Sequence, residues 1–322
     1  MRNGVRIVLV LMAFAFGCAP AAAADYPDHP VKIVVPFPPG GSTDIAARIV
    51  AEKLTVRLHR QFFVENIGGA GGNIGMAAVA RAASDGYTVL FASSSIVVNP
   101  NLYKSLPFDV NKDFIPVTKV GASPNSWDVN VTFPAKTMKE LIDAIKANPG
   151  KYSVASAGNG TTPSLAIDML KQRFDLNFVT VPFTGGGPMA QSVLGGFTPI
   201  TCAATTTVIG LIKSGKVRAL ALSGSQHLET LPGVPTLAEV GIADQESETM
   251  VGAFVPAGTP QPVVALLQKQ IAEIVRLPDV KQRLLDIATI PDGDSSADFA
   301  VYIKSEIAKW KRVIEAGKIP KI

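Results

Sequence analysis

A strand, a glycine-rich loop and a helix follow one another repeatedly along this chain, and this repeat limits its fold more than any other feature. The first copy is an apolar strand at residues 31–37, followed by a loop at 40–43 and a helix. Further copies begin with strands at residues 62–66, 152–157 and 177–183. Strands that alternate with helices form parallel sheets, so the pattern predicts an α/β protein.

The repeat falls into two blocks, and each block is too short for a large sheet of its own. We therefore expect two α/β lobes joined by a hinge of crossing strands. The first lobe would contain residues 25–122 and 253–322, and the second lobe residues 123–252. The chain would cross between them near residues 121–126 and 249–253.

Several helix starts carry capping signals. Ser42 or Thr43 can cap the first helix, and Thr162 can cap a helix in the second block. Thr137 and Glu140 have the spacing of a capping box, in which each side chain bonds a backbone N–H group at the helix start.

The amino terminus has the layout of a secretory signal peptide. Two arginines precede an apolar segment, and small residues follow it up to residue 24. We expect residues 1–24 to be cleaved, which places the mature protein outside the cytoplasm. Lipid attachment at Cys18 is an alternative, although Ala15 and Phe16 fit that signal poorly.

Composition excludes several classes of function. The formal net charge of +4 falls to 4 − 2 = +2 when Arg2 and Arg6 are removed, and no run of basic residues indicates nucleic-acid binding. Of the two cysteines only Cys202 lies beyond the expected cleavage point, so no internal disulfide is expected. The three histidines are far apart and lack metal-ligand spacing, so we expect neither a metal nor a cofactor.

The glycine-rich loops are candidate anion sites. They lie at residues 40–43, 68–73, 158–162 and 184–187, each between a strand and a helix. Such a loop presents free N–H groups at the positive end of a helix dipole, and glycine allows a ligand to approach the backbone. An ordinary tight turn explains any single loop, but four together favour ligand binding.

The loops fit a carboxylate better than a nucleotide. They contain neither the dinucleotide fingerprint nor a phosphate loop, and they lack Lys and Arg. No nucleophile elbow or catalytic triad pattern is present, so we expect no enzymatic activity. Asp44 is interpreted as a charge at the start of a helix, paired with Arg48 on the outer face of that helix, rather than as a catalytic acid or base.

A series of motifs resembles one known family. The motifs, in order, are "YPDHPVKIVVPFPPGGSTDIAARIVAEKL", "VENIGGAGGNIG", "DGYTVLFASSS", "SAGNGTTPSLA", "VPFTGGGPM", "IKSGKVRALAL", "LPGVPTLAEVG" and "VPAGTP". They are similar to the periplasmic solute-binding receptors of tripartite tricarboxylate transporters, also called Bug receptors. The resemblance covers nearly the whole mature chain. It implies a two-lobed type II periplasmic binding fold that closes on an organic carboxylate and delivers it to the membrane subunits of a transporter.

The same resemblance implies a set of ligand-binding residues. In the first lobe a carboxylate would lie between two of the loops, partly through ordered waters, and in the second lobe the site would be closed by three short segments. The implied residues are Phe37, Gly40, Gly41, Ser42, Thr43, Gly72, Asn73 and Ser94, then Ser156, Asn159, Thr161, Thr162, Phe183, Thr184, Gly185 and Ala203.

Departures from the family pattern bear on the ligand. Phe183 and Thr184 stand where many relatives have Tyr and Lys, and Ala203 stands where some relatives have an acid. Without that acid a ligand ammonium would lack a counter-charge, so we expect dicarboxylates or aromatic carboxylates rather than amino acids. Trp127 either stacks on an aromatic ligand or packs in the core, and the second alternative is favoured; the role of Asp128 stays open.

Two other functions stay open at this point. One is an α/β enzyme that uses the loops for a nucleotide, and the other is a receptor that serves a signalling kinase instead of a transporter. We expect the protein to be a monomer that does not bind nucleic acid.

Overall fold

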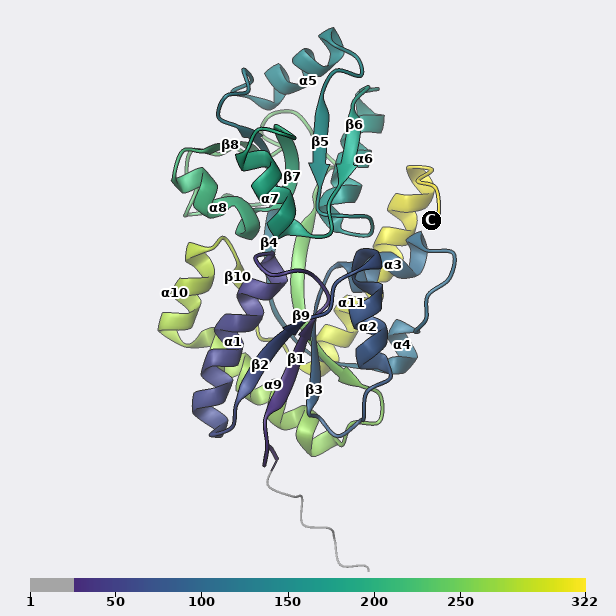
Figure 1. Ribbon diagram of the computed structural model, residues 1–322, viewed down its shortest axis with the longest axis vertical. Helices are drawn as coiled ribbons and strands as arrows, with labels where there is room; N and C mark the ends of the chain where they lie inside the picture. The colour runs from purple at the N-terminus through teal and green to yellow at the C-terminus, as the bar shows by residue number, and fades with distance from the viewer. Residues whose placement is uncertain (1–25) are drawn as a thin grey trace, which may run out of the picture.

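One strand runs through both halves of the molecule and links its two sheets. Strand β4 (Phe114–Asn130) pairs along residues 114–124 with the antiparallel β9 (Glu248–Pro256). Its last residues, 125–130, pair with β7 (Ile200–Ala204) and β8 (Val217–Leu222). Figure 1 shows β4 and β9 passing between two lobes that lie end to end. This computed structural model describes residues 26–322, so the expected signal peptide and the lipid site at Cys18 lie outside the described residues.

The first sheet has the strand order β2-β1-β3-β9-β4. Strands β1 (Val31–Val35), β2 (Phe62–Asn66) and β3 (Thr88–Ser93) are parallel, as the strand–helix repeat predicts. Strand β9 pairs antiparallel with β3, and β10 (Ile290–Pro291) pairs antiparallel with β4. The fold is therefore α/β with a mixed sheet, because β9 and β10 run against the other strands of this sheet.

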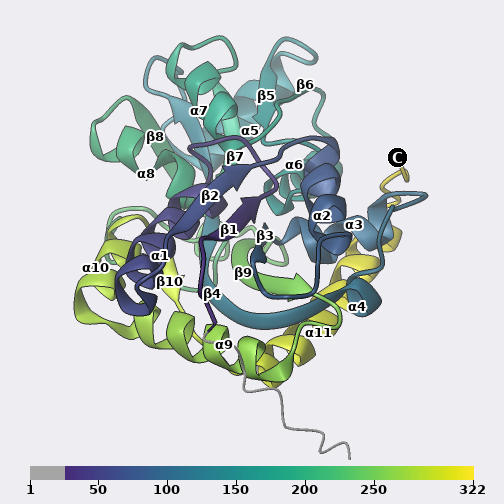
Figure 2. The same cartoon turned by 60° about the horizontal axis from the view of Figure 1, so that its bottom comes forward.

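Helices cover both faces of the first sheet (Figure 2). On one face α1 (Ser42–Leu58), α9 (Gln261–Arg276) and α10 (Pro278–Asp286) pack on alternate residues of β1 such as Val31 and Ile33. On the other face α2 (Asn73–Ala80), α3 (Ser95–Leu102) and α11 (Ser296–Ala316) pack on Val34 and its neighbours. This alternation follows from the period of two in a strand, which sends successive side chains to opposite faces.

The second sheet has the order β4-β7-β5-β6, with β8 also paired to β4. Strands β5 (Ser153–Ser156) and β6 (Val179–Pro182) are parallel to each other, and β7 is parallel to β5. Helices α5 (Met138–Ala147) and α6 (Thr162–Arg173) cover one face, and α7 (Gly186–Leu194) and α8 (Thr205–Lys213) cover the other. The remaining helices are the 3-10 turn η1 (Ala70–Gly72) and α4 (Val110–Asp113).

The chain passes between the sheets at two places. The first is at residues 124–125, where β4 changes partner from β9 to β7. The second precedes Glu248, since β9 pairs only within the first sheet from that residue onward. The predicted lobe limits stay a prediction; "first lobe" and "second lobe" below denote the parts built around the two sheets. No helix within residues 26–322 is both long enough and apolar enough to cross a bilayer.

Candidate functional site

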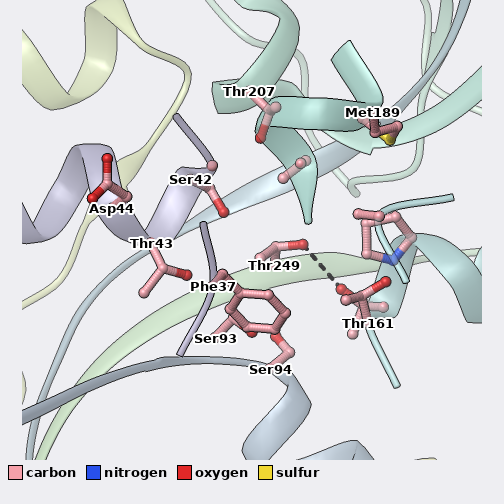
Figure 3. A pocket seen from close by; sticks show the side chains of 16 residues that line it. Phe37, Ser42, Thr43, Asp44, Ser93, Ser94, Thr161, Met189, Thr207 and Thr249 are labelled. Atoms are coloured by element: carbon pink, nitrogen blue, oxygen red, sulfur yellow. Dashed lines mark hydrogen bonds between the residues drawn. The ribbon is translucent and has the colours of Figure 1, made fainter. Parts of the chain in front are cut away.

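A cavity lies between the lobes, where strands of both sheets end and helices begin. Its first-lobe wall comes from the residues around the start of α1 and from the end of β3 (Figure 3). Its second-lobe wall comes from the residues around the starts of α6, α7 and α8, and β9 closes the back. The lining residues are Phe37, Gly41, Ser42, Thr43, Asp44, Ser93, Ser94, Ala157, Thr161, Thr162, Pro163, Gly186, Met189, Ala204, Thr207 and Thr249.

Most helix starts at the cavity have no side-chain cap. The N-cap residues Gly41 of α1, Ser94 of α3, Gly185 of α7 and Ala204 of α8 make no capping hydrogen bond. The first N–H groups of a helix have no partner inside the helix. The Ser95 amide of α3 and the Thr206 amide of α8 donate to serine hydroxyls, at 3.3 and 3.2 Å, whereas the first amides of α1 and α7 make no hydrogen bond with a described residue and can receive a ligand. Their partial positive charge favours an anion.

The expected cap of α1 is wrong, and the difference matters for the site. Gly41, not Ser42 or Thr43, occupies the N-cap position with an extended backbone, at φ −84° and ψ 167°. Both hydroxyls therefore belong to the first helical turn. In the second lobe the cap also moves by one residue, because Thr161 rather than Thr162 accepts the hydrogen bond from the Ser164 amide.

Three hydroxyl groups at the cavity make no hydrogen bond with any other described residue. They belong to Ser42 and Thr43 in the first lobe and to Thr207 in the second. Figure 3 shows the hydroxyl oxygens of Ser42 and Thr43 directed into the cavity. Ser42 and Thr43 are nevertheless buried, at 9 % and 2 % exposure, so a ligand would meet them largely shielded from water.

Other hydroxyls of the cavity are bonded to the strands that join the lobes. Ser94 and Thr162, from opposite lobes, both donate to the backbone oxygen of Glu248, at 3.3 and 2.8 Å. Thr249 donates to Asn125 Oδ1 at 2.8 Å and contacts the Thr162 hydroxyl at 3.0 Å, the bond drawn in Figure 3. The back of the cavity is thus connected to β4 and β9.

The walls carry little charge. Asp44 is the one charged side chain among the described lining residues, and no lysine or arginine lines the cavity. Phe37 and Met189 supply apolar surface. The cavity volume of about 40 Å³ corresponds to roughly three water molecules. The described residues contain no cluster of side chains that could hold a metal ion.

The comparison with family models gives the family. Residues 46–319 match the model of the tripartite tricarboxylate transporter family receptor. The chain belongs to this receptor family.

Two relatives of the receptor cover nearly all of it. One is a UPF0065 protein in the tcbD-tcbE intergenic region of Pseudomonas sp. strain P51, 35% identical over 90% of this chain and 86% of its own length. The other is protein BugT of Bordetella pertussis, 33% identical over 98% of this chain and 97% of its own length.

Solved structures agree with the fold of the receptor. Periplasmic binding protein BugD is 33% identical with a TM-score of 0.89, and covers 92% of this chain and 100% of its own. Rpa4515 of R. palustris, solved with adipate, is 28% identical with a TM-score of 0.90, covering 92% and 100%. MatC of Rhodopseudomonas palustris, solved with bound malate, is 29% identical with a TM-score of 0.84, covering 90% and 100%. The expected two-lobed periplasmic binding fold is confirmed.

The structure brings some of the predicted site residues together. Those that line the cavity are Phe37, Gly41, Ser42, Thr43, Ser94, Thr161 and Thr162. They come from both lobes and from elements that are distant in the chain, so the glycine-rich loops at 40–43 and 158–162 do meet.

Other predicted residues of the first lobe lie behind the cavity wall. The Gly40 amide donates to Asp44 Oδ2 at 3.0 Å. Asn73 Oδ1 accepts a hydrogen bond from Asn99 Nδ2 at 2.7 Å and so is occupied within the first lobe. Gly72 faces the Phe37 ring, where an added Cβ would lie 3.2 Å from the nearest ring atom.

The predicted distal residues of the second lobe also lie outside the described cavity. Ser156 accepts from the Gly158 amide, and Asn159 lines a separate surface hollow beside α6. Phe183 is half-buried against the core under α7, and Thr184 is exposed. Gly185, the N-cap of α7, is buried against Pro38 of the first lobe.

Positions 127, 128 and 203 are all in the core of the second lobe. Ala203 is fully buried and packs in the cluster that contains Met189, while its neighbour Ala204 lines the cavity. Trp127 is buried among residues of α5 and α6, which is the alternative that the sequence favoured, so it does not stack on a ligand in this cavity. Asp128 is fully buried in β4.

Sequence reasoning missed several lining residues. Thr207 belongs to the "TTT" that follows strand β7, which is the same strand, hydroxyl and helix pattern used to find the other loops. Asp44 was interpreted as a partner of Arg48 on an exposed face; the pair exists, at 2.9 Å, but Asp44 is buried in the cavity wall. Met189 and Thr249 carry no local signal, because their position depends on how α7 and β9 pack.

Proposed function

We propose that this protein is a periplasmic solute-binding receptor that captures a small organic carboxylate between its lobes and delivers it to the membrane subunits of a transporter. The observation that carries the proposal is the convergence of helix starts without a side-chain cap, from both lobes, on one cavity that no lysine or arginine lines. Neutral N–H and hydroxyl donors can bind a carboxylate by hydrogen bonds alone. A carboxylate site therefore does not need the lysine or arginine side chains that a phosphate site usually contains.

The relatives support the same ligand class. Two similar structures contain adipate and malate, which are dicarboxylates. A cavity with room for roughly three water molecules is smaller than either acid, so binding needs the lobes to move apart. Such hinge motion is usual for two-lobed receptors, and a short linear acid requires less of it than a longer or aromatic acid.

Apart from Asp44, the described wall contains no acidic side chain that could pair with the ammonium group of an amino acid, and this supports selection against amino acids. A ligand ammonium buried here would meet only Asp44, whose oxygens are already bonded to protein N–H groups. Burial of an unpaired ammonium is costly, so aspartate and glutamate should bind more weakly than their deaminated analogues succinate and glutarate.

Isothermal titration of the mature protein with succinate, malate, adipate and benzoate tests the proposal. Thr43→Val removes one free hydroxyl and keeps the side-chain shape, so it should weaken binding of the best acid about tenfold. Thr180→Val on β6, away from the cavity, is the matched control and should bind as the unmodified protein does. Binding of ATP or NAD in place of every acid would reject the receptor and favour a nucleotide-using enzyme.

A further inference from the structure

The wall of this proposed anion site contains an acid, and that acid is nearly inaccessible. Asp44 is 4 % exposed and lies in the first turn of α1, among the N–H groups that would receive a ligand carboxylate. A bare carboxylate in this place would repel the ligand. Its role therefore has to be found in its contacts.

Every contact of the Asp44 carboxylate is with an N–H donor of the protein. Oδ2 accepts from the Gly40 amide at 3.0 Å, and Arg48 Nε donates to both oxygens at 3.1 Å. Arg48 Nη2 lies 2.9 Å from Oδ1, and Asn66 Nδ2 donates to the same oxygen at 2.9 Å. Figure 3 shows this carboxylate turned away from the cavity, while the Ser42 and Thr43 hydroxyls face it.

These donors hold the carboxylate in its charged form. Burial by itself would raise the pKa of the Asp44 carboxyl, but the hydrogen bonds from Arg48, the Gly40 amide and Asn66 outweigh burial and lower that pKa below its ordinary value. The Arg48 guanidinium also balances the charge, so the ligand would experience a neutral pair rather than an isolated acid.

The same contacts tie down the loop that leads into α1. Asn66 Nδ2 donates to the Phe37 backbone oxygen at 2.9 Å as well as to Asp44. The loop is thus held at the Phe37 carbonyl and at the Gly40 amide. The chain turns at the second of these points, because Gly40 has a φ of +86°, in the left-handed region.

We propose that Asp44, acting with Asn66, is a positioning residue that fixes the loop at residues 37–41 in its ligand-binding shape before the ligand arrives. The proposal rests on the proposed carboxylate function. It means that Asp44 increases affinity for an anion although its own charge has the wrong sign, because preorganisation removes the cost of ordering the loop on binding.

Two physical effects of Asp44→Asn have opposite signs, which makes the proposal testable. If the charge dominated, removal of a negative group beside Arg48 would tighten binding of an anion. If positioning dominates, the single acceptor oxygen of asparagine cannot serve the Gly40 amide, Arg48 and Asn66 together, so the loop is held less firmly and we expect an affinity about tenfold lower. Asn66→Ala removes the hydrogen bonds to the Phe37 carbonyl and to Asp44 without any change of charge, and it should also weaken binding.

The experiment combines titration calorimetry with a readout that needs no ligand. Affinities for malate and adipate are measured for the unmodified protein, Asp44→Asn, Asn66→Ala and the control Asp109→Asn, an acid that caps α4 far from the cavity. The Gly40 amide is followed by proton–nitrogen NMR without ligand. In both loop variants we expect it to shift upfield and exchange faster with solvent, whereas Asp109→Asn should leave it in place.

The outcomes separate this inference from the proposed function. Equal or tighter binding by Asp44→Asn, or a Gly40 amide unmoved in both variants, overturns the positioning role. If the unmodified protein binds no carboxylate, the proposed function fails, while the NMR comparison still decides whether Asp44 and Asn66 hold the loop.

Discussion

Asp128 is a carboxyl group buried in the second lobe without a cation to balance it. Ser126 Oγ donates to Oδ2 at 2.8 Å, whereas Oδ1 has no hydrogen-bond partner and the side chain forms no ion pair with any described residue. Burial raises the pKa of Asp128 to about 8, and the Ser126 hydrogen bond opposes only part of this increase. The folded protein therefore holds this carboxyl protonated and neutral in mildly acidic solution.

The raised pKa predicts a loss of stability as pH increases. The unfolded chain releases the proton near pH 4, but the folded chain keeps it up to about pH 8. The stabilising contribution is complete below pH 4 and is lost as pH rises towards 8, so between pH 5 and 8 the free energy of unfolding should fall by up to about 4 kcal/mol from this group. Asp128→Asn should remove that slope, which urea unfolding at several pH values measures.

A matched variant isolates the effect of burial. Asp143 lies on the exposed surface of α5 in the same lobe, paired with Lys139. Asp143→Asn should leave the pH dependence of stability almost unchanged, because exposed ion pairs contribute little. If Asp128→Asn kept the slope of the unmodified protein, the buried carboxyl would not be its cause.

Helix α5 shows how local contacts define an element. The Thr137 hydroxyl accepts from the Glu140 amide at 3.1 Å, and Glu140 Oε2 accepts from the Lys136 amide at 2.6 Å. The expected capping box is present, except that the return bond goes to the residue before the cap. The hydrogen bonds that fix the helix start thus come from three residues close together in the chain, Lys136, Thr137 and Glu140.

Loss of this cap should affect stability and not ligand binding. Thr137→Ala leaves the Glu140 N–H group without its partner, so the free energy of unfolding should fall by about 1 kcal/mol. Thr137→Ser keeps the hydroxyl and should be close to the unmodified protein in urea unfolding. No residue of α5 lines the cavity, so carboxylate affinity should be equal in all three proteins, and a changed affinity would contradict this separation.

At the scale of the whole molecule, glycines at the junction let the backbones of the two lobes approach so closely that no side chain would fit between them. A Cβ added to Gly187 at the start of α7 would lie 2.4 Å from the Pro39 backbone oxygen of the first lobe. On another side of the junction, a Cβ added to Gly71 would lie 2.5 Å from the Asn159 backbone oxygen. Neither glycine lines the cavity, so close contact between lobes accounts for them.

This contact predicts that a single methyl group alters lobe closure. Gly187→Ala should hold the lobes further apart, giving a larger radius of gyration in small-angle scattering at saturating malate and a weaker affinity for it. Gly210→Ala in α8 is the matched control, because an added Cβ there meets nothing within 4 Å. An equal radius of gyration for both variants would show that the Gly187 contact does not limit closure.

The sequence by itself determined the features that depend on neighbouring residues. The alternation of strands and helices, the hydroxyl-bearing loops at the helix starts and the capping box of α5 all follow from side-chain periodicity and hydrogen bonds within one turn. The apolar residues of α11 from Phe299 to Ile314 likewise recur with the period of a helix, and the face that they form is buried.

Only the tertiary structure decided which groups face the ligand. Ser42 and Ser94 both follow a strand and lie at the start of a helix. The Ser42 hydroxyl is nevertheless free in the cavity, whereas the Ser94 hydroxyl is bonded to β9. Ala203 and Ala204 are adjacent, but the pleat of β7 buries one and exposes the other to the cavity. Asp44 turns away because Gly40 and Asn66 offer it donors. Such directions depend on contacts between segments far apart in the chain, and a local pattern contains no information about those contacts.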